Sequence, residues 1–438
     1  MAKKEIEHTS TMLGSQNMKS SQRMVSVVEP YELPEGWKWD LAKNLAEIYT
    51  GNSINEKVKQ EKYLGQTEGL NFIATKDIDF DGTIKYENGV KINDHEKFKI
   101  APKNTPLLCI EGGSAGRKLG FSEEEVCFGN KLCAFVCRDI NPKLLYFYLQ
   151  SNFFYHCFMK ERHGLIGGVS VNTLKQIPIP LPPTLAEQQR IVNRIESMFA
   201  KLDEAKEKAQ NVVDGFETRK AAILHKAFTG ELTAKWRKEN GVSDDSWEEK
   251  TIGELFTHTT GKALKKDNQI GTLRKYITTS NLYWGRFDFS EVREMYFTDG
   301  ELEKCTAKKG DLLVCNGGDV GRSAIWDFDY DICLQNHVSK LRKKDNNIET
   351  RLFFYYFMLS KIKGNVTAKG IGISSLSQKD LLAMKINLPT LPEQQEIVRI
   401  LDSVLEKERI AKQAAESALE QIDLLKKSIL ARAFRGEL

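Results

Sequence analysis

An internal repeat is the feature of this sequence that most constrains its fold. The segment ILHKAFTGEL, which ends at Leu232, returns as ILARAFRGEL, which ends at Leu438, 206 residues later in a chain of 438. The segments LPPTLAEQQRIV and NLPTLPEQQEIV are separated by the same offset, and LLCIEGGSAGR and LLVCNGGDVGR by 205. The period is too long for a solenoid, so the sequence predicts two domain-sized copies of one unit.

Composition indicates a globular protein without a membrane span. The chain is 41% hydrophobic and 28% charged, and no apolar run approaches the ~18 residues that a span needs. We expect residues 1–30 to form a disordered polar tail, and the eight cysteines to be free thiols in a cytoplasmic protein. Cys133 and Cys137 could form half of a zinc site, but the second copy has no equivalent pair, which favours buried thiols and no metal. A net charge of +4 permits nucleic-acid binding without arguing for it.

Each copy ends in a segment that is typical of a long helix. From Ala186 to Phe228 there is no proline, and apolar or small residues recur at alternating steps of four and three, interrupted by Arg219. The second copy repeats this heptad pattern from Ile397 to Ile429, interrupted by Glu408. A helix of ~43 residues is ~65 Å long.

One such helix cannot bury its row of apolar residues alone, so we expect the two helices to pair as a coiled coil. Packing of each helix on its own globular domain is the alternative. Antiparallel pairing would place the globular domains at opposite ends of a rod, related by a pseudo-two-fold axis. Parallel pairing would require the linker to carry the chain past a whole domain, so we predict an antiparallel coiled coil.

The rest of each copy combines short β-branched and aromatic runs with Gly, Asn and Asp turns, followed by one apolar helix, LLYFYLQSNFFYHCFM in the first copy and LFFYYFMLSKI in the second. The predicted fold class is therefore α+β, with two mixed α/β domains and two long helices. The predicted segments are a tail (1–30), a first domain (31–180), a first helix (181–232), a linker (233–245), a second domain (246–387) and a second helix (388–438).

Motifs for catalysis are missing from the sequence. We find no phosphate-binding G-x-x-x-x-G-K-[ST] loop, no dinucleotide-binding glycine pattern and no Asn/Asp-Pro-Pro-aromatic tetrad of an amino-methyltransferase. A Gly-Gly-x-x-Gly-Arg loop recurs instead in both globular domains. This loop is either a tight turn with a solvated arginine, or a site where backbone N–H groups and arginine approach phosphate or a base edge.

The doubled Pro-x-x-x-x-Glu-Gln-Gln signature at the helix starts, with the endings AFTGEL and AFRGEL, resembles the specificity (S) subunits of type I restriction-modification systems. The resemblance extends from about Tyr31 over nearly the whole chain, and LPEGWKW and SWEEKTIGELF are similar to the openings of that family's domains. It implies two target-recognition domains, each of which reads half of a bipartite sequence in double-stranded DNA. It also implies that the paired helices dock two methyltransferase (M) subunits.

The resemblance further implies a chain without catalytic residues of its own. In that family the M subunits bind S-adenosylmethionine and methylate adenine N6, while restriction (R) subunits use ATP and Mg²⁺. Two rival hypotheses are a coiled-coil scaffold that does not bind DNA, and a stand-alone DNA-modifying enzyme with an unrecognised active site. Salt-sensitive duplex binding would exclude the scaffold, and a methyl-transfer assay on the isolated chain would test the enzyme.

The repeat suggests which residues contact DNA. Polar residues follow matched strands, basic residues suit phosphate or guanine, and glycine-rich segments permit close backbone approach. The candidates are Thr75, Lys76, Asp77, Arg117, Lys118, Gly167 and Ser170 in the first copy, and Thr279, Ser280, Asn281, Arg322 and Ser374 in the second. The candidates for the coiled coil and M-subunit docking are Ile191, Ile195, Leu202, Phe216, Ile397, Leu401 and Ile422.

Overall fold

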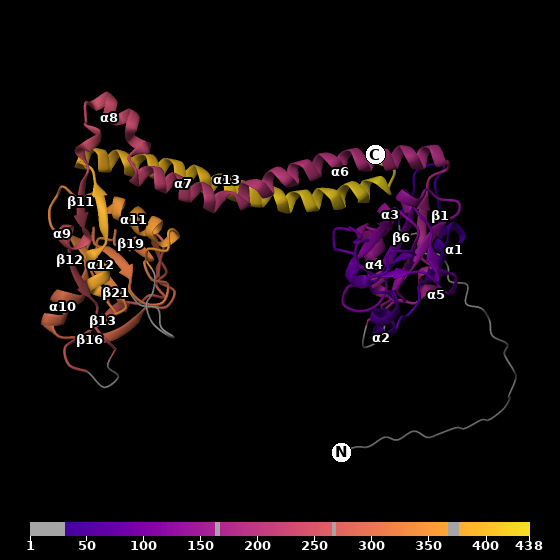
Figure 1. Ribbon diagram of the computed structural model, residues 1–438, viewed down its shortest axis with the longest axis horizontal. Coiled ribbons are helices and arrows are strands. Elements are labelled where there is room, and N and C mark those ends of the chain that lie inside the picture. The colour runs from indigo at the N-terminus through magenta and orange to yellow at the C-terminus, as the bar shows by residue number, and fades with distance from the viewer. Residues whose placement is uncertain (1–30, 163–166, 265–268, 367–375) are drawn as a thin grey trace, which may run out of the picture. The chain divides into compact units, whose positions relative to one another are not determined.

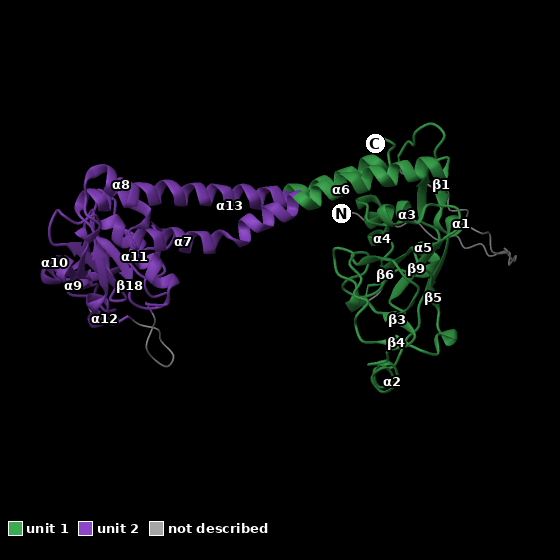
Figure 2. Cartoon of the chain, turned by 45° about the horizontal axis from the view of Figure 1, so that its top comes forward, with its two compact units in different colours: residues 1–204, 421–438 green, residues 205–420 purple. Residues whose placement is uncertain are grey.

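The computed structural model describes residues 31–162, 167–264, 269–366 and 376–438. The predicted tail and Ser374 lie outside these residues. The chain divides into two compact units, which Figure 2 colours separately. Unit 1 comprises Met1–Glu204 and Gln421–Leu438, and unit 2 comprises Ala205–Glu420.

Unit 1 contains two four-stranded sheets and one two-stranded sheet, with strand orders β2-β9-β6-β7, β4-β3-β8-β5 and β1-β10. Its strands are β1 (Lys38–Leu41), β2 (Ala46–Thr50), β3 (Leu70–Ile73), β4 (Lys91–Ile92), β5 (Ile100–Ala101), β6 (Thr105–Cys109), β7 (Leu119–Ser122), β8 (Val126–Phe128), β9 (Leu132–Cys137) and β10 (Pro178–Leu181). Its helices are α1 (Ala42–Leu45), α2 (Glu56–Val58), η1 (Lys59–Tyr63), η2 (Thr75–Asp77), η3 (His95–Lys97), α3 (Pro142–Leu149), α4 (Asn152–Lys160), α5 (Val171–Leu174) and most of α6 (Leu185–Asp214).

Unit 2 repeats this topology, with strand orders β12-β21-β18-β19, β16-β13-β20-β17 and β11-β22, and adds the hairpin β14-β15. Its strands are β11 (Glu248–Thr251), β12 (Phe256–Thr260), β13 (Thr272–Ile277), β14 (Leu282–Tyr283), β15 (Arg286–Phe287), β16 (Arg293–Phe297), β17 (Thr306–Ala307), β18 (Leu312–Cys315), β19 (Ser323–Ile325), β20 (Ile332–Leu334), β21 (Val338–Lys343) and β22 (Lys385–Leu388). Its helices are α7 (Phe216–Phe228), η4 (Glu231–Thr233), α8 (Ala234–Asn240), η5 (Asp244–Ser246), α9 (Ile252–Leu255), α10 (Asp299–Cys305), α11 (Thr350–Ile362), α12 (Gln378–Ala383) and much of α13 (Leu391–Ala433).

The two units match strand by strand, down to the parallel pair in each second sheet. Strand β3 pairs parallel with β8 in unit 1, and β13 pairs parallel with β20 in unit 2, with antiparallel partners elsewhere. The predicted α+β class and internal repeat are therefore confirmed. The apolar run from Leu144 to Met159 forms two helices, α3 and α4, rather than the single helix expected, because Ser151 caps a new helix by accepting a hydrogen bond from the Phe154 N–H.

The long helices pack on the globular core of each unit. In unit 1 the start of α6 and the last turns of α13 lie together over the domain (Figure 1), and Ile191, Ile195, Leu430 and Phe434 belong to its main core. In unit 2, Ile397 and Leu401 belong with Leu224 to the main core. Both sequence-based alternatives therefore hold in part, because helix ends pack on the domains as well as on each other.

Contacts between the helices run antiparallel within each unit. In unit 1, Asp203 forms an ion pair with Lys426, and Arg190 near the start of α6 donates to the Leu438 carbonyl. In unit 2, Arg219 and Glu408, the two charges that interrupt the heptads, form an ion pair of 2.8 Å between Nε and Oε2. Each charge is thus neutralised by the other, which explains how both positions are tolerated in the pair.

The first long helix is not continuous, contrary to the prediction. It is interrupted at Gly215, which separates α6 from α7, whereas α13 runs unbroken for 43 residues. A glycine inside a helix makes that helix about 1 kcal/mol less stable than an alanine would. The Arg219 guanidinium also donates to the Val212 carbonyl over 2.9 Å, and so binds one of the last carbonyls of α6.

The predicted docking residues mostly lie inside the protein. Ile191, Ile195, Ile397, Leu401 and Ile422 are buried, and Leu202 and Phe216 are half-buried. They stabilise the chain internally and have little surface left for a partner. The predicted row of apolar residues is wrong at Leu425, which is 49% exposed, because a single partner helix covers only a narrow seam.

Matching ion pairs attach each globular domain to its long helix. Lys143 at the start of α3 pairs with Glu196 on α6 in unit 1. In unit 2, Arg351 of α11 pairs with Asp402 on α13 over 2.8 Å. These pairs occupy equivalent positions in the repeat. Across the residues described, no helix is both long and apolar enough to cross a membrane.

Candidate nucleic-acid interface

The recurring glycine loop of unit 1 brings two cations onto an exposed aromatic ring. Lys118 donates from Nζ to the Thr75 carbonyl over 3.1 Å. The Arg117 guanidinium carbon and the Lys118 Nζ each lie 5.2 Å from the centre of the Phe80 ring. Phe80 is 63% exposed, and Arg117 is also exposed. We call Thr75, Lys76, Phe80, Arg117 and Lys118 the unit 1 cluster.

Unit 2 forms an equivalent arrangement. Arg322 donates from Nη2 to the Thr279 carbonyl over 2.5 Å, the counterpart of the bond between Lys118 and Thr75. Its guanidinium carbon lies 5.1 Å from the Tyr283 ring centre, and that of Arg286 lies 4.5 Å away. We call Thr279, Ser280, Tyr283, Arg286 and Arg322 the unit 2 cluster. A basic residue therefore contacts the matched threonine in both copies, although in unit 1 it is Lys118 and not Arg117, the residue that aligns with Arg322.

Two of the predicted contact residues stabilise a backbone turn instead. Asp77 accepts a hydrogen bond from the Ala74 N–H, and Asn281 accepts one from the Thr278 N–H, both over 2.9 Å. They are only 6% and 4% exposed. Both side chains accept a backbone hydrogen bond and have almost no exposed surface with which to contact a base. The prediction that they contact DNA is therefore wrong.

Buried thiols lie beneath both clusters. Burial raises the pKa of Cys109, which lies against Thr75 and Lys118. Burial also raises the pKa of Cys315, which lies against Arg322, and that pKa is about 11. The neutral thiols add no negative charge beneath the cations, and Arg322 is paired instead with Asp319 over 3.8 Å. All eight cysteines are free, and burial raises the pKa of Cys133 and of Cys137 to about 12.

Left-handed glycines shape the two loops. Gly116 and Gly321 have φ of 74° and 86°, and a Cβ on either would lie under 3.0 Å from Phe158 or Val366. Gly167, a predicted contact residue, has φ of 64° and accepts a hydrogen bond from the Gly112 N–H, so it supports the unit 1 loop from behind. Ser170 is exposed and caps α5.

Gly167→Ala is expected to lower the free energy of unfolding of unit 1 by about 1–3 kcal/mol, because a left-handed non-glycine residue is strained. Its Cβ would also lie 2.4 Å from Nε of Arg162, which donates to the Gly112 carbonyl. Urea unfolding measures the change. Gly113→Ala is the matched control, because a Cβ there meets nothing within 4 Å. Equal stability of both variants would contradict a supporting role for Gly167.

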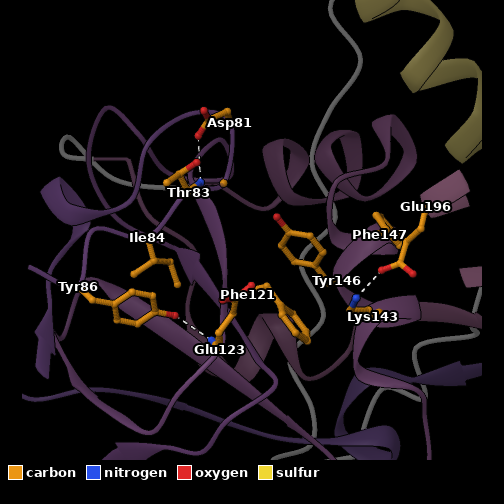
Figure 3. Close-up of a pocket in the computed structure, with 11 residues that line it drawn as sticks. Asp81, Thr83, Ile84, Tyr86, Phe121, Glu123, Lys143, Tyr146, Phe147 and Glu196 are labelled. Atoms are coloured by element: carbon orange, nitrogen blue, oxygen red, sulfur yellow. Dashed lines mark hydrogen bonds and ion pairs between the residues drawn. The ribbon is translucent and has the colours of Figure 1, made fainter. Parts of the chain in front are cut away.

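A cavity of 420 Å³ lies behind the turn that carries Phe80. Figure 3 shows Asp81, Thr83 and Ile84 on one side, and Tyr146, Lys143 and Glu196 on the other. The Tyr86 hydroxyl accepts from the Glu123 N–H at its base. The cavity therefore lies between this turn and the helices α3 and α6.

Sequence reasoning found most of each cluster and missed the rings. It named Thr75, Arg117 and Lys118, which the structure brings together, and Thr279 with Arg322, which also meet. It missed Phe80, Tyr283 and Arg286. The signal for the two rings was an aromatic residue at a turn, Phe80 in DFDGT and Tyr283 in LYWGR.

Two copies of one mixed α/β domain, each presenting cations and an aromatic ring, define a two-site nucleic-acid recognition protein. The chain belongs to the family of the type I restriction modification DNA specificity domain, whose family model matches residues 34–213 and 244–421. The predicted resemblance is thus confirmed.

Individual relatives extend over nearly the full chain. The specificity subunit of the type I restriction enzyme EcoKI from Escherichia coli K12 is 24% identical, over 93% of this chain and 90% of that protein. The StySPI specificity subunit from Salmonella potsdam is 25% identical with the same coverage. The crystal structure of the HsdS subunit from Thermoanaerobacter tengcongensis has a TM-score of 0.65 at 19% identity, and the match covers 94% of this chain and 99% of that one.

Proposed function

We propose that this chain is the sequence-specific recognition subunit of a type I restriction-modification complex, and that each unit reads one half of a bipartite DNA target. The single observation that carries the proposal is the doubling of the family's DNA specificity domain, with an aromatic and cationic cluster in each copy. The subunit itself is non-catalytic, as specificity subunits of type I systems are.

The clusters suit duplex DNA in their chemistry. Arginine and lysine bind phosphate or the O6 and N7 acceptors of guanine, and hydroxyl groups such as those of Thr75 and Ser280 bind either. The two clusters differ in composition, with Phe80 and Lys118 in one and Tyr283 and Arg286 in the other. Different half-sites are therefore expected.

The long helices are the proposed docking surface for two M subunits and, through them, for R subunits. Support comes from exposed apolar side chains on α13, where Ile410 is 52% exposed and Leu424 is 64% exposed. In the proposed complex the M subunits bind S-adenosylmethionine and methylate adenine N6, and the R subunits bind ATP and Mg²⁺. In this proposal the cofactors belong to the M and R subunits and not to this chain.

The test is to express the chain with its M subunit in a host that lacks adenine methylation, and to map methylated adenines. We expect one motif with two unrelated half-sites and a fixed spacer. Arg322→Ala should relax only one half-site, and Arg117→Ala only the other. A methylome without any motif would favour the scaffold hypothesis, whereas methylation by the isolated chain would favour a stand-alone enzyme.

A further inference from the structure

Phe80 is exposed at a fixed position, which is unusual for so apolar a side chain. It sits at the tip of a tight turn, where the Asp79 N–H donates to the Thr83 carbonyl over 2.9 Å and the Gly82 N–H donates to the Asp79 carbonyl over 3.2 Å. The Thr83 N–H also donates to the Asp81 carboxylate over 2.9 Å. The ring is therefore presented to solvent by a closed, hydrogen-bonded loop.

The turn is also supported from below. A Cβ added at Gly82 would lie 2.5 Å from the Tyr146 hydroxyl oxygen and 3.1 Å from the Leu119 carbonyl, so the backbone of the turn rests directly on α3 and β7. Lys85 forms an ion pair with Asp79, one of the two acids that flank Phe80, over 2.8 Å. Such preorganisation reduces the entropy lost when the ring contacts a ligand.

The cations restrict how the ring can meet DNA. Arg117 and Lys118 both lie over the ring, so at least one face is covered by charged groups. A wedge between base pairs needs both faces free for stacking, which the cations prevent. The free edge of the ring can instead contact an apolar group in the major groove, while the cations bind phosphate or guanine beside it.

We infer that Phe80 is a specificity-determining residue that contacts the C5-methyl group of a thymine in the half-site read by unit 1. The methyl group is the one apolar feature that the major-groove edges of the bases present. This inference rests on the proposed function, because it assumes that the unit 1 cluster faces DNA. It predicts a thymine next to a guanine or a contacted phosphate in that half-site.

Uracil lacks only the C5-methyl group, so thymine-to-uracil substitution isolates the contact. The half-sites are first identified from the methylome, and duplexes are made with each thymine replaced in turn. Binding is measured for the chain assembled with its M subunits. For the unchanged protein, one replacement in the unit 1 half-site should weaken binding about fourfold, the factor for one methyl group leaving contact.

Phe80→Ala should bind the thymine and uracil duplexes equally, and Phe80→Leu should keep part of the preference. Tyr283→Ala is the matched control and should leave the preference in the unit 1 half-site unchanged. A persistent preference in Phe80→Ala, or none in the unchanged protein, would overturn the thymine contact while leaving DNA recognition intact. Failure of the unchanged complex to prefer its site over random duplex would instead overturn the proposed function.

Discussion

Glu393→Ala is expected to destabilise unit 2 by about 3–5 kcal/mol, because three donors lose their acceptor, while Arg237 keeps only its second ion pair, with Asp244 over 3.0 Å. Glu393 is fully buried and accepts from Arg237 Nη1 and Thr233 Oγ1, each over 2.7 Å, and from Trp247 Nε1 over 3.0 Å. Thr233 lies in η4, Arg237 lies in α8, and Trp247 directly precedes β11. The carboxylate therefore holds the connection between the repeats against the start of α13.

The repeat supplies a matched control for this variant. Glu187 occupies the same place in the first Glu-Gln-Gln motif, but its side chain is 30% exposed and binds Arg190 on its own helix over 2.8 Å. Glu187→Ala should change stability by less than about 1 kcal/mol. Hydrogen exchange and thermal unfolding of the full chain measure both effects. Similar losses for the two variants would contradict the role assigned to the buried carboxylate.

The double variant Arg117→Ala with Lys118→Ala is expected to weaken specific duplex binding by at least 10-fold, because a base-contacting or phosphate-contacting cation contributes about 1–3 kcal/mol. The salt dependence of binding should also become shallower by about one to two units of slope. Titration of the assembled complex at several salt concentrations measures both quantities.

Arg138→Ala is the control, because Arg138 is an exposed cation of the same unit that pairs with Glu47 over 3.0 Å, away from the cluster. It should leave the affinity and the salt slope nearly unchanged. Should both variants weaken binding alike, the effect would reflect overall charge, and the unit 1 cluster would lose its assignment.

The repeat made the fold predictable, because the matched residues occur in the same order in both copies. In the sequence, Ile73 aligns with Ile277 and Cys127 with Cys333, and these alignments identify β13 as the equivalent of β3 and β20 as the equivalent of β8. The interruption at Gly215 was not predictable from heptad spacing, since it depends on the Arg219 side chain and the Val212 carbonyl.

The candidate site was predicted in part for a related physical reason. Basic residues in a recurring glycine loop point to anions whatever their neighbours, so Arg117, Lys118 and Arg322 could be named. The Phe80 ring can be recognised as part of the site only from its contacts with Arg117 and Lys118, which are distant from it in sequence. Similarly, polar side chains such as Asp77 and Asn281 look alike in sequence whether they face solvent or satisfy a buried N–H.

The sharing of α13 between two cores has a consequence for synthesis on the ribosome. The core of unit 1 includes Ile429, Leu430 and Phe434, and the Tyr31 hydroxyl donates to the Phe434 carbonyl across a separation of 403 residues. The first segment of unit 1 ends at Glu204, so at about 5–20 residues per second it must wait roughly 10–50 s for these residues. During that interval its nascent strands carry an incomplete apolar face, which makes it a natural client for chaperones.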